Sequence, residues 1–435
     1  MAREQVNVGL LGCGTVGSGF ARMAVANAEK IRRRLGAALN IARVAVLDPE
    51  KEAIAELPRG IFCADAMALV TDPEIDIIVE CIGGVGAAKD LVFAAVERGK
   101  SVVTANKELL AKYGHELLAL AREKGVDVNF EASVASAIPL IRPMKESIEA
   151  DNVNSILAIL NGTTNYILMR MAKDHLPFDQ ALAEAQEQGY AEQDPSDDID
   201  GHDAAYKLAI IASIAWEQSV DIDQVVREGI REIEPRDHEA AQECGYVIKL
   251  LAIAKQAPDG RLEIRVHPAL VPEDHPLASV AGAYNAVFLS CEYAGNLMFY
   301  GPGAGSFPAG SAILGDVIDA ARNILRGAAG RVPCTCAARA ELVPPSEFES
   351  GHYVRAMVVD EPGVLGSIAT IFGQHRVSIA AVHQQEAENG EAEIIWITHT
   401  CKQEAFDKAL AGIKALPCVN KICASIRVEH SIKRT

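Results

Sequence analysis

The stretch VNVGLLGCGTVG at residues 6–17 decides the expected fold of the first part of the chain. An apolar run ends in Gly12, and Gly12, Gly14 and Gly17 stand in a GxGxxG spacing just before a helical pattern. In such a turn the first glycine permits the tight bend, the second lets the backbone approach a pyrophosphate, and the third lets helix and strand pack closely. The stretch therefore predicts a dinucleotide site at the helix N-terminus, and a plain glycine turn is the weaker alternative.

The segments around this turn alternate between strand and helix patterns. Helical patterns, beginning with residues 15–36, separate predicted strands at 6–12, 42–48, 75–81, 101–105 and 126–130. Such alternation is typical of parallel strands joined by crossover helices. We therefore expect an α/β fold whose first domain is a Rossmann-type nucleotide-binding domain over 1–150, completed by about 301–330.

The pattern changes after residue 150. Helices are predicted at 164–174, 178–188 and 203–217, and strands at 156–162, 246–256, 261–271 and 283–295. The long strands indicate an antiparallel sheet, so we expect an α+β domain over 151–300. A glycine-rich turn at 301–305 and an amphipathic helix at 310–326 follow this domain.

The last hundred residues predict a linker and a separate module. Residues 331–350 contain three prolines and mixed polar residues, which is typical of a linker. Residues 351–435 show the order strand, helix, strand, strand, helix, strand, with the second helix at 403–415 and the last strand at 421–428.

The composition is that of a packed globular chain, with 49% apolar and 23% charged residues, and its 435 residues suggest about three domains. A net charge of −18 disfavours nucleic acid and anionic membranes as partners, because both would repel the chain. The N-terminus lacks a signal-peptide pattern, and no apolar run reaches the ~18–20 residues of a membrane span. We expect a soluble cytoplasmic protein whose ten scattered cysteines stay reduced.

Polar residues follow two of the predicted strands. Asp48 ends the strand at 42–48, where a carboxylate would hydrogen-bond the adenosine ribose and repel a 2′-phosphate. Capping of the next turn is an equally good interpretation of Asp48. Thr104, Asn106 and Lys107 follow the strand at 101–105 and would project into the ligand crevice, although a solvated helix start is the common alternative.

The densest polar segment, 189–207, reads GYAEQDPSDDIDGHDAAYK and leads into an apolar helix. Asp203 and Lys207 are four residues apart, so they share one face of that helix. A solvated ion pair is the plain interpretation, but partial burial at the head of an apolar helix would lower the pKa of Lys207 and suit proton transfer. A calcium loop is disfavoured, because the run lacks the ligand spacing of that motif.

Two further turns carry polar side chains. Glu131 follows the strand at 126–130, and capping of a helix is its plain role. The turn at 161–166, NGTTNY, offers amides and hydroxyls that could hold a small polar ligand. Its alternative is ordinary capping, with Thr163 or Thr164 at the N-cap.

Together these strings resemble the homoserine dehydrogenase family over nearly the whole chain. The matching strings are GLLGCGTVG, TANKELLA, EASVASAIPLI, ILNGTTNYIL, GYAEQDPSDDIDGHDAAYKLAI, GPGAG and a C-terminal module similar to an ACT (βαββαβ) domain. Their joint order is more specific than any single string. The resemblance implies a catalytic and dimerisation domain at 151–300 and an ACT regulatory domain at 351–435.

The resemblance also implies a reaction and roles for individual residues. Members of the family reduce L-aspartate 4-semialdehyde to L-homoserine with NAD(P)H, at the branch toward threonine and methionine. Lys207 is expected to donate the proton, helped by Asp203. Glu192 and Asp198 are expected to hold the ammonium group of the substrate, and Lys107 its carboxylate or the bound cofactor.

Further site residues follow from the same resemblance. The expected cofactor-binding residues are Gly12, Gly14, Thr15, Val16, Gly17, Asp48, Thr104, Lys107 and Gly303, the last of which closes over the nicotinamide. A structural sodium ion is expected at Glu131 with the backbone oxygens of Val134, Ser136 and Ile138, although this chain reads VASAIP where the family commonly has a glycine-rich turn. Leu47 stands where NADP-preferring relatives often carry arginine, which favours NAD or the use of both cofactors.

The ACT-like module is expected to bind an amino-acid effector, most readily threonine, at Asp360 and Gly363, and to lower activity. The resemblance further implies a homodimer or homotetramer.

Two rival functions are less well supported. An aspartate-semialdehyde dehydrogenase needs a nucleophilic cysteine, and no cysteine here lies in a recognisable catalytic setting. A non-catalytic sensor of nucleotide and amino acid would not need the pairing of Asp203 with Lys207.

Overall fold

The computed structural model describes residues 3–333, 335–336, 338–386 and 390–429. The chain forms two compact units, each made of three segments. The first unit comprises Met1–Ile156, Tyr206–Gln224 and Asn285–Ala340, and the second comprises Leu157–Ala205, Val225–Tyr284 and Glu341–Thr435. Strand β7 (Val153–Ile159) and helix α10 (His202–Ala215) each pass from one unit into the other.

A six-stranded parallel sheet with the order β3-β2-β1-β4-β5-β6 forms the centre of the first unit. Its strands are β1 (Gln5–Leu11), β2 (Ala38–Ala45), β3 (Phe62–Cys63), β4 (Ile77–Glu80), β5 (Ser101–Thr104) and β6 (Val128–Asn129). This is the Rossmann strand order, in which ligands bind at the carboxyl ends of the strands where the order reverses, here between β1 and β4. The predicted Rossmann-type domain is confirmed.

Helices connect these strands as predicted, with one difference. They are α1 (Thr15–Ala26), α2 (Ala28–Leu35), α3 (Pro49–Glu52), α4 (Ala66–Thr71), α5 (Gly86–Glu97) and α6 (Lys107–Lys124). The single helix predicted at 15–36 is wrong, because the chain breaks at Asn27, whose backbone leaves helical geometry with ψ at 13°. The Asn27 side chain donates to the Met23 carbonyl at 2.9 Å, which ends α1 before α2 begins.

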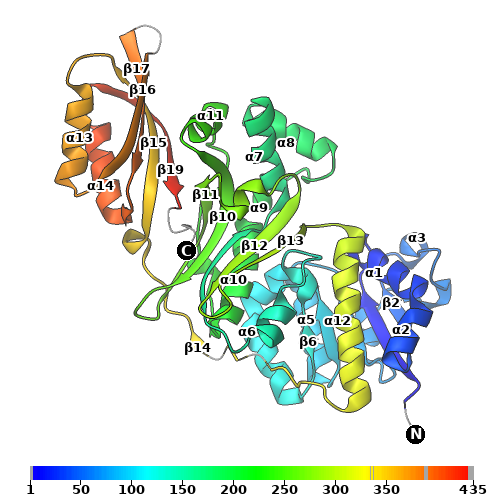
Figure 1. Ribbon diagram of the computed structural model, residues 1–435. Coiled ribbons are helices and arrows are strands. Elements are labelled where there is room, and N and C mark those ends of the chain that lie inside the picture. Colours follow the sequence, from blue (N-terminus) through cyan, green and yellow to red (C-terminus); the bar gives the residue numbers. More distant parts are fainter. Residues whose placement is uncertain (1–2, 334, 337, 387–389, 430–435) are drawn as a thin grey trace. The chain divides into compact units, whose positions relative to one another are not determined.

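Helix α12 (Ser306–Arg326) is distant in sequence but packs directly on α1 (Figure 1). A β-carbon placed on Gly310 would lie 2.7 Å from the Phe20 nitrogen, and one on Gly19 would overlap the main-chain oxygen of Ser306. The Ser306 hydroxyl also donates to the Thr15 carbonyl at 2.6 Å. The two helices therefore meet backbone to backbone, which only glycine at these positions permits.

The strand predicted at 283–295 is also wrong in extent. The structure has two strands, β12 (Tyr284–Cys291) and β13 (Asn296–Pro302), joined by a turn at Gly295 with φ at +72°. The Cys291 N–H donates to the Gly295 carbonyl at 2.9 Å, and the carboxylate of Asp151 accepts the amides of Tyr293 and Ala294 at 3.0 and 2.7 Å.

The first unit also holds the short parallel pair β8 (Gln218–Ser219) and β14 (Ala338–Arg339). Residues 334 and 337 of the predicted linker lie outside the described residues.

The second unit begins with a group of helices and a long antiparallel pair. The helices are α7 (Gly162–Asp174), α8 (Phe178–Glu187), α9 (Ser196–Ile199) and α11 (Pro235–Glu243), and α10 starts here. The pair β10 (Tyr246–Gln256) and β11 (Leu262–Pro272) runs in continuous register, and the short β9 (Val226–Arg227) pairs with β11. The antiparallel strands predicted at 246–256 and 261–271 are confirmed, the second displaced by one residue.

The C-terminal module folds as predicted, with the order βαββαβ. Its elements are β15 (Glu349–Val359), α13 (Val364–Gln374), β16 (Ile379–Glu386), β17 (Glu391–Thr398), α14 (Gln403–Lys414) and β19 (Val419–Val428), with the short β18 (Cys401–Lys402) paired to β15. The strands lie in the order β19-β15-β17-β16, and Figure 1 shows both helices on one face of them. Phe372, Trp396 and Phe406 fill the apolar layer between sheet and helices.

Within the second unit this module is joined to the long antiparallel pair. Strand β19 runs parallel to β11, with Arg427 beside Ala269 and Val428 beside Leu270. Arg355, whose side chain is 5% exposed, reaches the buried Asp237 of α11 at 2.7 Å. The guanidinium of the buried Arg265 in β11 likewise reaches Glu429 at 2.7 Å. Removing one partner from such a buried pair is strongly destabilising, so the module is held by more than its linker.

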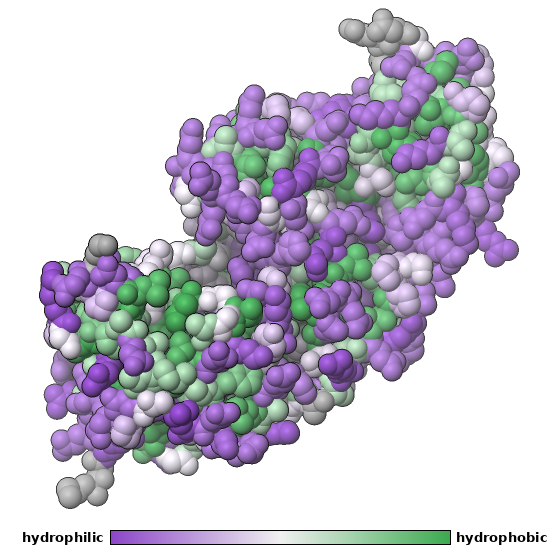
Figure 2. Space-filling model, turned by 180° about the vertical axis from the view of Figure 1, so that it is seen from behind, coloured by the Kyte–Doolittle hydropathy of each residue, from purple (hydrophilic) through white to green (hydrophobic). Residues whose placement is uncertain are grey.

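None of the described helices is long and apolar enough to cross a membrane. On the face shown in Figure 2, hydrophilic side chains surround separate patches of apolar ones.

Gly310→Ala is expected to destabilise the first unit by about 1–3 kcal/mol, because the added methyl group would overlap the main chain of α1. Gly315→Ala on the same helix is the matched control, since a β-carbon there meets nothing within 4 Å. It should be neutral or stabilising by up to ~1 kcal/mol through helix propensity. Thermal unfolding of both variants checks this, and equal effects would contradict the proposed backbone contact.

Candidate active site

The glycine turn after β1 has the geometry of a phosphate-binding turn. Gly12 has φ at +87°, and a β-carbon on it would lie 2.9 Å from the Cys81 carbonyl oxygen. A β-carbon on Gly17 would overlap the Gly12 carbonyl, so the start of α1 lies directly against the turn. A β-carbon on Gly14 would meet no atom within 4 Å. The open side of Gly14, at the N-terminus of a twelve-residue helix, leaves room for an anion.

Asp48 lies three residues beyond β2 and takes part in a cap. Its carboxylate accepts the Glu50 amide at 3.2 Å, and its own amide donates to the Glu52 carboxylate at 2.9 Å. The capping alternative is therefore present in the structure, at the sheet edge where a ribose would also lie. The neighbouring Leu47 is 96% exposed. Because leucine is uncharged, no cation stands at that position.

Glu80 is a buried carboxylate that sequence reasoning missed. It ends β4, and its Oε1 accepts the amides of Ile82 and Gly83 at 2.8 and 2.9 Å. Its Oε2 accepts the hydroxyl of Thr104 at 2.5 Å. The Thr104 hydroxyl, predicted to contact cofactor, is thus engaged within the protein. Glu80 ties the ends of β4 and β5 together, and the signal that could have found it is an acid at the end of the apolar run IDIIVEC.

Lys107 is the first residue of α6 and is half-buried. Asn106 caps this helix, since its Oδ1 accepts the Leu109 amide at 3.0 Å. The Asn106 Nδ2 also donates to the Gly84 carbonyl at 2.6 Å. These bonds fix the start of α6 at the carboxyl end of β5, on the same side of the parallel sheet as the glycine turn after β1.

A second polar centre lies in the second unit, around Asn161. The Asn161 Nδ2 donates to Asp198 Oδ1 at 2.6 Å and to Asp203 Oδ2 at 2.9 Å. The structure therefore brings two predicted site residues onto one amide, although they come from α9 and α10. Asn161 is also the N-cap of α7, accepting the Thr164 amide at 2.8 Å, so the prediction of Thr163 or Thr164 as the cap is wrong.

The other predicted residues of the acidic segment are placed differently. Lys207 is half-buried and lies one turn after Asp203 on α10. Glu192 is exposed, and its main-chain oxygen accepts Gln186 Nε2 at 3.0 Å. Glu192 thus stands on the surface of the segment that leads to the half-buried Asp198 and the buried Asp203.

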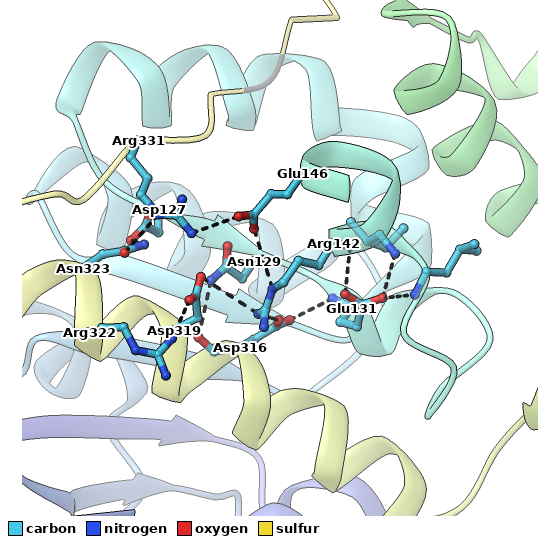
Figure 3. A network of polar contacts seen from close by, with 12 residues as sticks. Asp127, Asn129, Glu131, Arg142, Glu146, Asp316, Asp319, Arg322, Asn323 and Arg331 are labelled. Carbon is cyan, nitrogen blue, oxygen red and sulfur yellow. Dashed lines mark hydrogen bonds and ion pairs between the residues drawn. The ribbon is translucent and has the colours of Figure 1, made fainter. Parts of the chain in front are cut away.

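Glu131 belongs to a network of polar contacts shown in Figure 3. Its Oε1 accepts the amides of Leu140 and Ile141 at 2.5 and 2.6 Å, and its Oε2 accepts that of Arg142 at 3.0 Å. Asp316 of α12 accepts the Glu131 amide at 2.8 Å and the Arg142 guanidinium at 2.9 Å. Burial raises the pKa of Asp316 to about 7. The Glu131 carboxylate therefore caps the helical turn that follows residue 140.

The turn between Glu131 and this cap contains the other predicted sodium ligands. Ala135 and Ser136 both have positive φ, at 54° and 53°. The Ser136 hydroxyl is buried and has no hydrogen-bond partner among the described residues. Val134 and Ile138 are fully buried. Oε2 of Glu131 accepts the Arg142 amide, and a carboxylate oxygen has two lone pairs, so this carboxylate can still meet a cation beside the carbonyl oxygens.

The remaining predicted residues lie in turns. A β-carbon on Gly303 would overlap the side-chain amide of Asn285 in β12, so this position requires glycine for packing. In the C-terminal module Asp360 and Gly363 are exposed, and Gly363 is the N-cap of α13 with φ at +98°. The cap has no side chain that could occupy the first-turn amides of α13.

Known proteins match each part of the chain. A family model described as homoserine dehydrogenase matches residues 139–318, its NAD binding domain matches 12–131, and an ACT domain model matches 352–418. The homoserine dehydrogenase of Neisseria gonorrhoeae is 42% identical over 432 residues, covering 98% of this chain and 99% of its own length.

Solved structures agree with these matches. A homoserine dehydrogenase from Thiobacillus denitrificans matches with a TM-score of 0.93 at 40% identity, over 98% of this chain and 99% of that one. A hyperthermophilic archaeal homoserine dehydrogenase in complex with NADPH matches with a TM-score of 0.62 at 28% identity, over 73% of this chain and 97% of that one. With its glycine turn, its acid-rich segment and its C-terminal module in the same order, the chain belongs to the homoserine dehydrogenase family of oxidoreductases, with an NAD-binding domain and an ACT domain.

Proposed function

We propose that the chain catalyses the reversible reduction of L-aspartate 4-semialdehyde to L-homoserine, on the route to threonine and methionine. The observation that carries this proposal is the gathering of Asp198 and Asp203 on the amide of Asn161, next to the start of α10. Paired carboxylates accept hydrogen bonds only, so they suit the ammonium group of an amino acid. Lys207 follows on the same helix as a candidate proton donor.

We assign each residue a role in substrate binding or proton transfer. Asp198 holds the ammonium group, and the exposed Glu192 contributes a further charge to it. Lys107 holds the substrate carboxylate or the cofactor. Lys207 donates a proton to the carbonyl oxygen as the alcohol forms, and Asp203 orients it from one turn away. In the reverse direction Lys207 takes the proton from the homoserine hydroxyl group.

The glycine turn fits a nicotinamide dinucleotide, because Gly14 faces open space at the N-terminus of α1. Gly12, Gly14, Thr15, Val16 and Gly17 would hold the pyrophosphate. When bound, the reduced nicotinamide supplies the hydride that the aldehyde carbon accepts. Asp48 beside an uncharged Leu47 disfavours a 2′-phosphate, so we infer use of NAD or of both cofactors. Thr104, through its main chain, and Gly303 would complete the cofactor contacts.

A structural sodium ion is the second bound group that we propose. Ser136 supplies the supporting observation, since its buried hydroxyl has no partner among the described residues. Glu131 and the backbone oxygens of Val134, Ser136 and Ile138 would hold the ion, and Glu131 also shapes the turn through its contacts with the amides of residues 140–142. The ion would hold in place the turn that follows β6.

We also propose that the enzyme is a homodimer or homotetramer in the cytoplasm. Strand β13 stands at the end of its sheet, and Met298 and Tyr300 on it are 38% and 55% exposed. An edge strand of this kind can pair with the same strand of a second copy. The domain boundaries that we favour are 1–150 with 301–330, 151–300, a linker at 331–350, and 351–435.

The ACT domain is proposed to bind threonine and lower activity. Gly363 leaves the first-turn amides of α13 open to a ligand carboxylate, where the helix dipole favours an anion, and Asp360 lies beside it. Strand β19 of the same domain pairs with β11, and Arg355 reaches Asp237 of α11. A ligand that shifts the domain would therefore shift the elements of the second unit that it touches.

Lys207→Ala should lower kcat by ~10²–10⁴, because it removes the proton donor, while cofactor affinity changes little. The test is the rise of reduced-nicotinamide absorbance with homoserine and either NAD or NADP, together with a cofactor titration. Asp203→Asn should also be strongly impaired. A Lys207→Ala enzyme that keeps most of its kcat would contradict the assignment.

Threonine is expected to inhibit the full-length enzyme, and Gly363→Val should abolish that response without changing the uninhibited rate. A side chain at φ +98° is strained and would cover the amides that bind the effector. Gly373→Ala is the matched control, because it lies near the end of α13 and a β-carbon there meets nothing within 4 Å. The measurement is the initial rate at increasing threonine concentration for the wild type and for both variants. A wild-type enzyme indifferent to threonine and related amino acids would leave the domain only a structural role.

A further inference from the structure

The amide of Asn161 is fully engaged in hydrogen bonds. Its Nδ2 donates to Asp198 and Asp203, and its Oδ1 accepts the amide and the hydroxyl of Thr164, both at 2.8 Å. A carboxamide has two donor hydrogens and two acceptor lone pairs, so all four are used. The arrangement also fixes which way the amide faces, because only the NH₂ group can donate to carboxylates.

Both carboxylates accept a hydrogen bond from this one nitrogen. Asp203 is 2% exposed and Asn161 is 4% exposed, so water does not easily replace the bond between them. Two negative groups within hydrogen-bond distance of the same atom repel one another, and a donor between them offsets part of that repulsion. Asn161 therefore links the two carboxylates through a single donor group.

Asn161 itself is fixed by a second layer of buried contacts. Asn165, one turn along α7, donates from Nδ2 to the carbonyls of Val280 and Gly282 at 3.3 and 2.9 Å. The ammonium group of Lys249 in β10 donates to Asn165 Oδ1 at 3.2 Å and to the Val280 carbonyl at 2.6 Å. Burial lowers the pKa of Lys249 to about 8. A β-carbon on Gly162 would lie 2.8 Å from the Ala283 carbonyl oxygen, so the first turn of α7 packs directly against the main chain there.

We propose that Asn161 is a positioning residue of the dehydrogenase reaction, which keeps the carboxylates of Asp198 and Asp203 together for the ammonium group of the substrate and for the proton transfer at Lys207. This inference rests on the proposed roles of Asp198, Asp203 and Lys207. Asn161 acts through the two carboxylates and does not itself touch the reacting atoms. The helix N-terminus that it caps adds favourable potential for the same negative charges.

Asn161→Asp is the sharpest test, because aspartate caps a helix as well as asparagine does but cannot donate to a carboxylate when ionised. A third carboxylate would raise the pKa of the pair, since the donor that stabilised the ionised form is replaced by a like charge. We expect kcat/KM for homoserine at neutral pH to fall ~10²-fold, and the acid limb of its pH profile to move to higher pH. The KM for the cofactor should change less than about threefold, because the glycine turn is untouched.

Asn161→Ser is the second variant, which keeps a capping oxygen and adds no charge. It should lower kcat/KM by ~10-fold without the large shift in pH profile. Arg170→Ala is the matched control on the same helix, since it breaks the contact of Arg170 with Glu184 at 2.8 Å and leaves the carboxylate pair alone. It should lower the unfolding temperature but keep the wild-type kinetics and pH profile.

The outcomes separate this inference from the proposed function. If both Asn161 variants keep wild-type kinetics and pH profile while Asp203→Asn is inactive, the positioning role is wrong and the proposed function stands. If Asp203→Asn and Lys207→Ala also keep their activity, the proposed function itself fails. If the Arg170→Ala enzyme shows the same kinetic losses as the Asn161 variants, the effect is general loss of structure, and the positioning role is overturned.

Discussion

The contact between the start of α1 and the end of β1 is the constraint on which the first unit depends. A β-carbon on Gly17 would overlap the carbonyl of Gly12, so the helix can begin this close to the strand only because residue 17 is glycine, and the φ of +87° at residue 12 favours glycine there as well. The same closeness directs the first-turn amides of α1 toward the open side of Gly14. It also places α1 where α12 can pack on it through Gly19 and Gly310. One short turn thus determines both the anion site and the packing of a helix almost three hundred residues later in the chain.

Buried polar groups determine the rest of the arrangement. A carboxylate removed from water is tolerated only where donors surround it, and Glu80, Glu131 and Asp203 each meet amide donors from other elements. Glu80 fixes the loop after β4, and Glu131 caps the turn after residue 140. In the second unit Asn161 is the donor, and its side-chain amide donates to two carboxylates. The polar residues therefore specify the loops, while the apolar layers hold the sheets and helices together.

The sequence could predict those parts of the fold that have local causes. Three features depend on residues that are close together in the sequence: the glycine spacing at 12–17, the strand and helix alternation, and the order of the ACT module. The structure confirms all three. The hairpin at Gly295 was hidden within an apolar run, because the carboxylate that stabilises its turn belongs to Asp151. The break at Asn27 depends on a side-chain bond that competes with the helix. Neither signal is visible in apolar periodicity.

The residues of the candidate site also differ in whether a local sequence signal could identify them. Asp198, Asp203 and Lys207 stood out because charges cluster in one segment before an apolar helix. Asn161 lies 37 and 42 residues away from the two carboxylates that it holds, so no spacing rule could join them. Glu80 and Thr104 meet only because β4 and β5 are neighbours in the sheet. The pairing of β19 with β11 likewise became evident only in three dimensions.

The proposed dinucleotide site at the glycine turn is tested most directly by the affinity of a reduced nicotinamide cofactor for Gly14→Val, measured by the change in cofactor fluorescence on binding. A β-carbon at Gly14 meets no atom within 4 Å, so we expect a side chain there to leave folding intact and to fill the space proposed for the pyrophosphate. Gly60→Val is the control, since its β-carbon is equally unobstructed. We expect a Kd at least ~10-fold higher for Gly14→Val, with an unchanged unfolding temperature and normal binding by Gly60→Val. Wild-type affinity in a folded Gly14→Val enzyme would contradict the proposed site.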